Sequence, residues 1–503
     1  MPGTREELFE ELDLWSTGHF SKDDSKRIYF LTGAAGLGKS SIAHQFCTRL
    51  DDPEKRSLGA SFFFERGGGD LESTRLFFPT LAYQLATSQP QLRSRIIIAA
   101  RGHHERGDLQ QMRHTFEDLF RAPLLDTPID EGPIVLVIDG LDECRERDMI
   151  PHLLRALLDL VRVLPWLQIF LTSRPEPHVL GIFTSPEARS MVYHRSLDDT
   201  VDAWEDDVAR YLRETIPKIP TYTVFVQKYP DELENLVRRA GGVFIYARIA
   251  INFLDMYDDH PDEQFDLLLS SLGTGVKPLD ALYLQVLKSA FPPTDSRRHE
   301  RLREFLAAIV LLKRMFTPDV VALLCHGLTK DDVVSMVDRL RSVLLVGADG
   351  VVRPIHATLC EFLLDKTRCT DPLYYVNRRK GHAQLAAACF DAFSFETMTD
   401  CLKVDPIQND TSAISLYVHY AFQHWIEHLQ DAEFREELLT RLHALNSYRM
   451  PVYRRSSWLM TRNYSIYMKR LEQWLKVRNT CLFSGNMSKL LICICLLMYR
   501  RPI

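Results

Sequence analysis

The sequence lacks the patterns that mark several protein classes. Its ten cysteines are scattered, with no CxxC pair and no metal-ligand spacing. They therefore predict reduced, buried thiols rather than a disulfide framework or a zinc site. Lysine and arginine are scattered too, and the net charge is −6. Because a nucleic-acid binder neutralises phosphates with a concentrated basic face, we expect no nucleic-acid partner.

Long apolar runs and internal repeats are also missing. The first 25 residues are too charged to hold a secretory signal. The one membrane-like stretch, Leu490–Met498, is far shorter than the ~20 residues that a spanning helix needs. We therefore expect a cytoplasmic protein with no membrane partner. The 46% apolar and 25% charged content is that of an ordinary globular protein, and 503 residues suffice for roughly three domains.

Strand-length apolar runs alternate with helical patterns over the first 195 residues. This alternation predicts an α/β domain, with a parallel sheet flanked by helices on both faces. The expected strands are Ile28–Thr32, Gly59–Phe64, Ile134–Ile138, Leu167–Thr172 and Met191–His194. The expected helices between them are Lys39–Leu50, Arg75–Ala86 and Met149–Val163.

The strand signal fades after residue 195. Helices are expected at Asp199–Thr215, Pro230–Asp255, Pro261–Ser270 and Asp280–Ala290, then at Glu300–Leu312, Thr317–Leu323 and Lys330–Arg341. Two short strands follow, Leu344–Gly347 and Val351–Pro354, with an Asp-Gly turn that is typical of a hairpin. Helices followed by a hairpin predict a winged-helix domain. From about residue 371 to 480 the pattern is helical again.

The first motif that carries chemistry lies between a predicted strand and a predicted helix. It fits G-x-x-x-x-G-K-[ST], the phosphate-binding P-loop, and consists of Gly33, Ala34, Ala35, Gly36, Leu37, Gly38, Lys39 and Ser40, with Ser41 next in the helix. Glycines let successive N–H groups point at phosphate oxygens, and the helix start adds the positive end of its dipole. We expect Lys39 to reach the β- and γ-phosphates and Ser40 to coordinate Mg²⁺.

The second motif is the buried strand Ile134–Ile138, which runs into Asp139 and then Asp142 and Glu143. Ligands bind at the carboxyl ends of strands in open parallel sheets, so Asp139 is placed to hold Mg²⁺. Asp142 or Glu143 could polarise an attacking water. A third strand end carries Arg174, whose guanidinium could contact the γ-phosphate.

The identity of the base is less directly encoded. The string Thr329-Lys330-Asp331-Asp332 fits the [NT]KxD pattern of guanine-specific proteins, but it lies far downstream of the sheet. It also fits a helix start, with Thr329 as the cap and Asp332 in the first turn. We interpret it as a cap and favour adenine over guanine.

Taken together, these motifs resemble the NACHT branch of the STAND signalling ATPases. The resemblance is to the fungal NACHT proteins, whose nucleotide domain is similar to the N-terminal region of nephrocystin. It covers about residues 1 to 380, and more loosely 381 to 475. The segments that carry it are Pro2–Arg5, Gly33–Ser41, Phe62–Phe64, Thr80–Leu85, Asp139–Glu143, Thr172–Pro175 and Ala240–Ala247.

This resemblance implies four parts and a mechanism. The parts are a nucleotide-binding P-loop domain (1–195), a helical domain (196–275), a winged-helix domain (276–370) and a C-terminal helical region with a short apolar tail (371–503). ADP would be held in a closed form, and ATP exchange would open the domains. The open form would oligomerise with copies of itself or with related NACHT proteins. His356 would contact the β-phosphate of ADP, and Thr4 and Arg5 would lie near the adenine.

Several alternatives stay open. Fungal relatives usually carry an N-terminal effector region and C-terminal sensor repeats, neither of which is found here, so a truncated product or a regulator of longer relatives is one reading. A scaffold that retains nucleotide without hydrolysis is another, and a GTPase is a third. A small-molecule kinase is disfavoured by the long helical continuation after the sheet.

Overall fold

The computed structural model describes residues 4–18, 26–53, 55–106, 112–125, 132–198, 201–256, 260–270, 277–292, 296–393, 413–433, 435–438 and 440–441. It divides the chain into two compact units, Met1–Leu282 and Tyr283–Ile503. The finer division into four domains stays a prediction. The Pro2-Gly3 pair and the apolar tail after residue 487 lie outside the described residues.

The first unit is built on a five-stranded parallel sheet. Its order is β2-β3-β4-β1-β5, and the strands are β1 (Ile28–Thr32), β2 (Leu58–Phe63), β3 (Ile134–Asp139), β4 (Leu167–Ser173) and β5 (Val192–Ser196). All neighbouring strands run parallel. The predicted parallel sheet is therefore present, with strand ends displaced by one to two residues. Its order places β4 between the strand before the P-loop and the strand that ends in Asp139.

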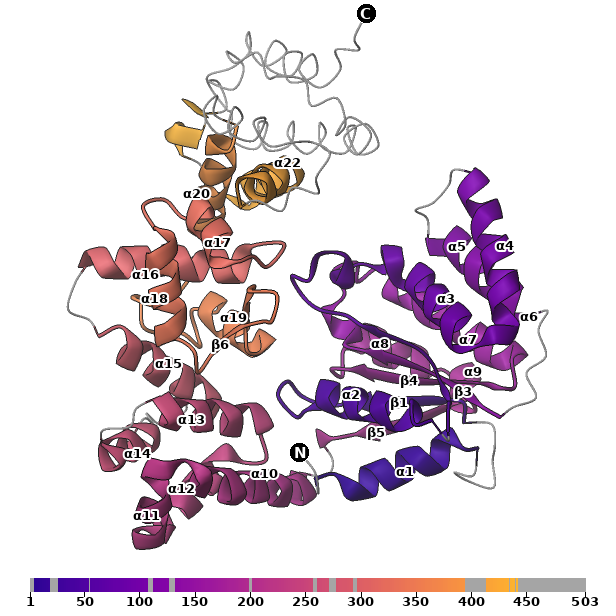
Figure 1. The fold of residues 1–503 in the computed structure, drawn as a ribbon, viewed down its shortest axis with the longest axis horizontal. Coiled ribbons are helices and arrows are strands. Elements are labelled where there is room, and N and C mark those ends of the chain that lie inside the picture. Colours follow the sequence, from indigo (N-terminus) through magenta and orange to yellow (C-terminus); the bar gives the residue numbers. More distant parts are fainter. Residues whose placement is uncertain are drawn as a thin grey trace, which may run out of the picture. The chain divides into compact units, whose positions relative to one another are not determined.

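Helices cover both faces of this sheet (Figure 1). Alternate residues of each strand point to opposite faces, so Tyr29 packs in one core and Phe30 in the other. One face is covered by α1 (Glu6–Ser16) and α2 (Lys39–Leu50), through side chains such as Trp15 and Phe46. The opposite core is larger. It is formed with α3 (Phe77–Ser88), α4 (Pro90–Arg106), the helical segment Met112–Leu125, α7 (Ile150–Val163), α8 (Pro177–Phe183) and α9 (Pro186–Arg189).

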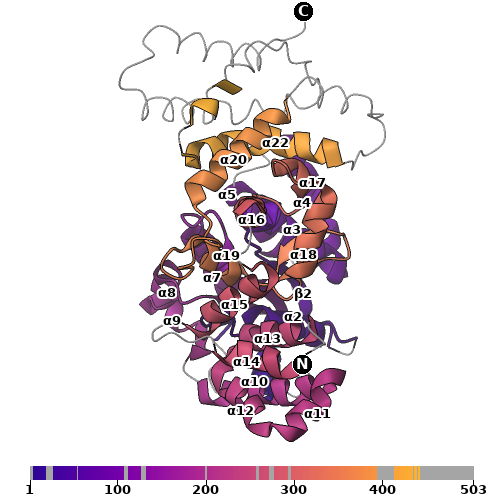
Figure 2. The ribbon, with the colours of Figure 1, turned by 90° about the vertical axis from the view of Figure 1, so that its left-hand side faces the viewer.

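A cluster of helices completes the first unit, and both ribbon views show it (Figures 1 and 2). It consists of α10 (Val201–Thr215), α11 (Pro220–Lys228), α12 (Pro230–Ala240), α13 (Phe244–Met256) and α14 (Pro261–Ser270). The single helix expected over Pro230–Asp255 was wrong. Gly241 and Gly242 adopt φ values of 51° and 73°, which L-residues avoid, so the chain breaks there and restarts as α13.

The second unit contains helices followed by a hairpin. The helix α15 (Pro278–Ala290) contains the boundary between the units, and α16 (Ser296–Leu311), α17 (Pro318–Leu324) and α18 (Lys330–Arg339) follow. Strands β6 (Leu344–Val346) and β7 (Val352–Pro354) pair antiparallel, which confirms the predicted hairpin. Then come α19 (Ala357–Leu364), α20 (Arg378–Asp391) and α22 (Ala413–Asp431).

A buried chain of polar groups joins α20 to α22. The Nδ1 atoms of His382 and His428 lie 2.9 Å apart, and Tyr420 Oη lies 2.7 Å from His428 Nε2. The amide of Lys313 donates to Tyr420 Oη, so the tyrosine hydroxyl can donate to His428 Nε2. His428 Nδ1 then carries the proton and donates to His382 Nδ1. Burial lowers the pKa of both imidazoles, so both are neutral at pH 7.

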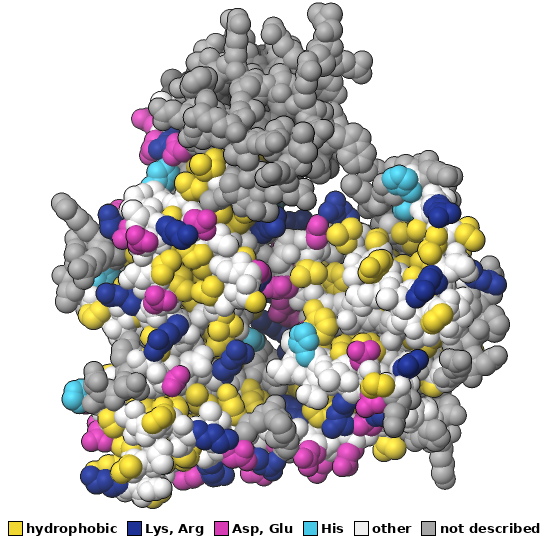
Figure 3. Space-filling model, in the orientation of Figure 1, with side chains coloured by type: hydrophobic (Ala, Val, Ile, Leu, Met, Phe, Trp, Pro, Cys, Tyr) yellow, Lys and Arg dark blue, Asp and Glu magenta, His cyan; other side chains and the backbone are white. Residues whose placement is uncertain are grey.

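Two further findings concern the surface. No helix in the described part of the chain is long and apolar enough to cross a membrane. On the face that Figure 3 shows, the Lys and Arg side chains of each unit stand among acidic and apolar ones.

Candidate nucleotide-binding site

The P-loop connects β1 to α2 as the sequence predicts. Its apex needs glycine, because Gly36 and Gly38 both have a φ of 86°. Gly38 is the N-terminal cap of α2, so the first amides of that helix face the loop. Lys39 Nζ donates to the carbonyl oxygens of Gly33 and Ala34, at 2.7 and 3.0 Å. Burial lowers the pKa of Lys39, and the nearby Asp142 opposes this shift.

The two predicted metal ligands are neighbours. Asp139 is buried at the end of β3, and the hydroxyl of Ser40 hydrogen-bonds to its carboxylate. Burial raises the pKa of Asp139, while hydrogen bonds from Thr172 and Ser40 lower it. A hydroxyl and a carboxylate are the hard oxygen ligands that Mg²⁺ prefers, so this pair fits the cation. Ser41, one residue further on, is exposed.

Thr172 links the two strands at this edge, a role that the sequence did not suggest. Its hydroxyl donates to Asp139 Oδ1 and accepts the amide N–H of Gly140, at 2.5 and 3.0 Å. Thr172 is fully buried in β4, directly beside the end of β3 in the register of the sheet. It therefore fixes both the direction of the Asp139 carboxylate and the turn that follows it. A threonine at the end of a core strand was the only signal that could have pointed to this role.

Asp142 and Arg174 form a pair across the site. Arg174 donates to Asp142 through its backbone N–H at 2.9 Å and through Nε at 3.0 Å. Asp142 is buried, and the side chain of Arg174 is 20% exposed. Both oxygens of Asp142 thus hold the arginine at the carboxyl end of β4. In this arrangement Asp142 orients Arg174, whereas the sequence had also suggested that it could polarise water.

Glu143 lies in the short helical turn after β3. Its Oε2 accepts the amide N–H of Arg66 at 3.0 Å, from the loop that follows β2. Burial raises the pKa of Glu143, and the hydrogen bond from Arg66 opposes the rise. A raised pKa is one property of a general base that works near neutral pH. The contact with Arg66 joins segments 77 residues apart, so no local pattern predicted it.

The start of α13 packs directly on the P-loop. The N–H of Ile245 donates to the carbonyl oxygen of Gly36 at 3.4 Å. A Cβ atom at Gly36 would lie 2.4 Å from Ile245 Cγ2 and 3.3 Å from Val243 Cγ1. The break at Gly241-Gly242 makes this contact possible, because an unbroken helix would have no N-terminus there. The helical cluster therefore touches the phosphate loop itself.

Arg5 joins the N-terminal segment to the same place. Its guanidinium donates to the carbonyl oxygen of Leu37 at 2.6 Å and lies 5.5 Å from the ring centroid of Phe244. Its backbone N–H donates to Asp207 of α10 at 3.0 Å. Burial lowers the pKa of Arg5 to about 10, with Asp207 opposing. Thr4 is buried beside it. Arg5 thus lies against the P-loop, as expected, together with α10 and α13.

The segment after β5 holds the first half of the P-loop. The N–H of Leu197 donates to the carbonyl oxygen of Thr32 at 2.8 Å, and its side chain lies against Gly33. Asp198 accepts the N–H of Ala34 at 3.1 Å. Neither residue belongs to a motif, so the sequence gave no indication of them. Ala34 is exposed and Ala35 half-buried.

The remaining predicted residues lie in the second unit. His356 caps α19: its Nδ1 accepts the N–H of Thr358 at 3.2 Å and lies 2.7 Å from that residue's hydroxyl. This pattern places the proton of the neutral ring on Nε2. Thr329 and Asp332 form a reciprocal capping box at the start of α18, which confirms the interpretation of this segment as a helix cap.

The fold and the site define the first unit as a P-loop nucleoside-triphosphate-binding domain. Residues 3–174 match the family model described as "Nephrocystin 3, N-terminal". That match runs from beside Arg5, through the P-loop and Asp139, to Arg174. No curated protein matches the chain.

Solved structures with some similarity are also ATPases or replication proteins by name. A Walker-type ATPase of Pyrococcus abyssi is 16% identical, with a TM-score of 0.32, and the match covers 71% of this chain and 94% of that one. A Drosophila ORC structure bound to DNA is 14% identical (TM-score 0.31, covering 70% and 84%). Cdc6p from Pyrobaculum aerophilum is also 14% identical (TM-score 0.28, covering 73% and 93%). These similarities are weak, and the class of the domain rests on its own site.

Proposed function

We propose that this chain is an ATP- and ADP-binding signalling switch of the NACHT type. The observation that carries the proposal is the contact of α13 with the phosphate loop at Gly36. A helix seated on this loop changes its environment when phosphates change, and a ligand can shift a conformation only through such differential contacts. Slow hydrolysis would then return the switch to its ADP form.

The site residues have distinct roles in this proposal. Lys39 and the amides at the start of α2 bind phosphate oxygens, and Ser40 and Asp139 hold Mg²⁺, which neutralises phosphate charge. Glu143 accepts a proton from a water whose oxygen bonds to the γ-phosphorus. The bond from that phosphorus to the bridging oxygen breaks, which leaves ADP and phosphate. Arg174, oriented by Asp142, stabilises the charge on the γ-phosphate.

Nucleotide binding is the first test. Native mass spectrometry and analysis of released nucleotide should find ADP bound to the purified chain. Lys39→Ala should weaken ADP binding by about 100-fold, because charge-assisted hydrogen bonds contribute about 1.5–3 kcal/mol. Lys55→Ala is the matched control, since Lys55 is exposed and pairs only with Asp13 among the described residues. Equal affinity in the two variants would refute the phosphate site.

Nucleotide selectivity and hydrolysis need separate measurements. Competition between ATP and GTP for the site tests the adenine preference, because the guanine-type string at Thr329 is a helix cap. Release of phosphate in a single turnover tests hydrolysis. Tight ADP retention without phosphate release would instead favour a nucleotide-bound scaffold.

We further propose that the second unit carries a winged helix whose His356 contacts the β-phosphate of ADP. The support is the order of helices, hairpin and capped helix around His356. His356→Ala should speed ADP dissociation and favour oligomers in multi-angle light scattering. His104→Ala, at an exposed position of α4, should change neither. Unchanged ADP dissociation in His356→Ala would remove this residue from the site.

A nucleic-acid partner is not part of this proposal. The interspersed charges on the face in Figure 3 support that view, since binding to phosphates needs a concentrated basic surface. Retention on DNA–cellulose at 0.15 M salt would contradict it.

A further inference from the structure

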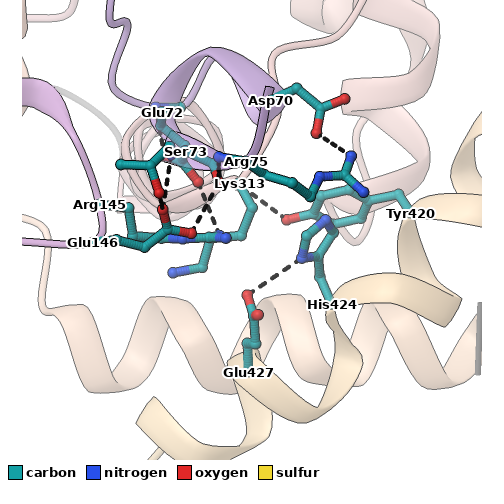
Figure 4. A network of polar contacts seen from close by, with 12 residues as sticks. Asp70, Glu72, Ser73, Arg75, Arg145, Glu146, Lys313, Tyr420, His424 and Glu427 are labelled. Carbon is teal, nitrogen blue, oxygen red and sulfur yellow. Dashed lines mark hydrogen bonds and ion pairs between the residues drawn. The ribbon is translucent and has the colours of Figure 1, made fainter. Parts of the chain in front are cut away.

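The loops that follow β2 and β3 are tied together beside the nucleotide site. Glu146 accepts hydrogen bonds from Ser73 Oγ at 2.8 Å and from both N and Oγ1 of Thr74, at 2.8 and 2.7 Å. Arg145 donates its backbone N–H to the carbonyl oxygen of Glu72 at 2.7 Å. Figure 4 shows Glu72, Ser73, Arg145 and Glu146 turned toward one another. The two loops therefore form one packed unit.

Glu72 is the buried centre of this unit. It is only 6% exposed, and its Oε1 lies 3.0 Å from Arg145 Nη1. Its Oε2 accepts the N–H of Gly67 at 3.0 Å. Gly67 has a φ of 76°, which only glycine adopts freely. A loop of such residues does not hold its own shape, so the carboxylate of Glu72 determines where the Arg66–Gly67 peptides lie.

The fixed loop presents one amide to the candidate base. The N–H of Arg66, directly before Gly67, donates to Glu143 Oε2 at 3.0 Å. Oε1 of Glu143 has no hydrogen-bond partner among the described residues. One oxygen of Glu143 is thus anchored by the loop, and the other is the one left to act on water.

We propose that Glu72 is a positioning residue for hydrolysis, which acts by holding the Arg66 amide against Glu143. This inference rests on the proposed function. A reaction of bound water is sensitive to small displacements of the base, since a misplacement of about 1 Å can cost about 100-fold in rate. Glu72 touches neither nucleotide nor water in this scheme, so nucleotide affinity is independent of it.

The decisive measurement is single-turnover phosphate release, normalised to the amount of bound nucleotide. Glu72→Ala removes the acceptor for Gly67 and should slow phosphate release about 10-fold or more. ADP affinity should stay within about twofold of the parent chain, since the phosphate-binding groups are untouched. Glu72→Gln keeps an acceptor at the same reach and should restore most of the rate. Asp70→Ala is the control: it removes an acid from the same loop, and that acid is exposed and paired with Arg75.

Coupling to Glu143 separates positioning from a general structural effect. Glu143→Gln should itself slow phosphate release about 100-fold, as expected for loss of a general base. Adding Glu72→Ala to Glu143→Gln should then have no further effect, because Glu72 acts only through Glu143. An equal loss in both backgrounds would overturn the proposal, and so would a parent-like rate in Glu72→Ala.

A milder variant covers the case in which Glu72→Ala does not fold. Glu72→Asp keeps the charge but shortens the side chain by one methylene, so it withdraws from Gly67. It should slow phosphate release more than Glu72→Gln does, and the reverse order would overturn the proposal. A parent chain that binds ATP but releases no phosphate would also overturn it, while leaving nucleotide binding intact.

Discussion

The contact between Gly36 and Ile245 gives a quantitative test of how the P-loop is held. Gly36 and Gly38 have the same φ of 86°, so an added Cβ strains the backbone equally at both. They differ in space. A Cβ at Gly36 would lie 2.4 Å from Ile245 Cγ2, whereas at Gly38 the nearest listed atom, Phe244 Cδ2, would be 3.9 Å away. Gly38→Ala is therefore a matched control for Gly36→Ala.

The expected costs follow from these distances. An L-residue in the left-handed region costs about 1–2 kcal/mol. Crowding against a packed side chain adds about 1–3 kcal/mol. We therefore expect Gly38→Ala to lower the free energy of unfolding by about 1–2 kcal/mol and Gly36→Ala by about 2–5 kcal/mol. The reduced entropy of the unfolded chain offsets both by a similar amount.

Denaturant unfolding in the absence of nucleotide measures this difference. The clash should disappear when its partner is shortened, so Gly36→Ala combined with Ile245→Ala should cost less than the sum of the two single variants. Equal costs for Gly36→Ala and Gly38→Ala, together with additive behaviour of the double variant, would refute the packing of α13 on the P-loop.

Three other predictions concern separate parts of the chain. Thr329→Ala removes a capping box and should cost about 1 kcal/mol in denaturant unfolding, and no measurable cost would contradict the cap. Thr172→Val keeps the side-chain shape but leaves Asp139 without its donor, and should cost about 1–3 kcal/mol. Parent-like stability there would refute the proposed link between the strands. Burial lowers the pKa of His382 to about 4, below the 6.5 of an unfolded histidine, so the unfolded state binds more protons between these values. Stability of the α20–α22 pair should be full above pH 6.5 and fall as the pH drops toward 4. Hydrogen exchange of His428 and its neighbours, corrected for intrinsic rates, would contradict this if protection did not depend on pH.

Local patterns predicted the catalytic edge of the sheet well. Continuous apolar runs located β1, β3 and β4, and a parallel sheet places their carboxyl ends together. Lys39, Asp139 and Arg174 therefore lie at one edge, as expected from the sequence alone. The cap at Thr329 was predictable for the same reason, because its partner is three residues away.

Contacts set by packing were not predictable. The periodicity of Pro230–Asp255 continues across Gly241 and Gly242, so it hid the break that puts α13 on Gly36. The anchoring of Glu143 by Arg66 depends on β2 lying beside β3, which no single-sequence pattern encodes. The pair of Asp142 and Arg174 likewise needed the position of β4.

The seat of α13 on the P-loop makes this helix a lever. It has 13 residues, which corresponds to a length of about 20 Å at 1.5 Å per residue. Its fulcrum is the hydrogen bond from Ile245 to Gly36. By this geometry, a tilt of about 5° at that end displaces the far end by about 1.7 Å, which is larger than the tolerance of a close-packed core. A rotation of one peptide in the phosphate loop, too small to alter the sheet, is thereby amplified into a repacking of the helices around α13.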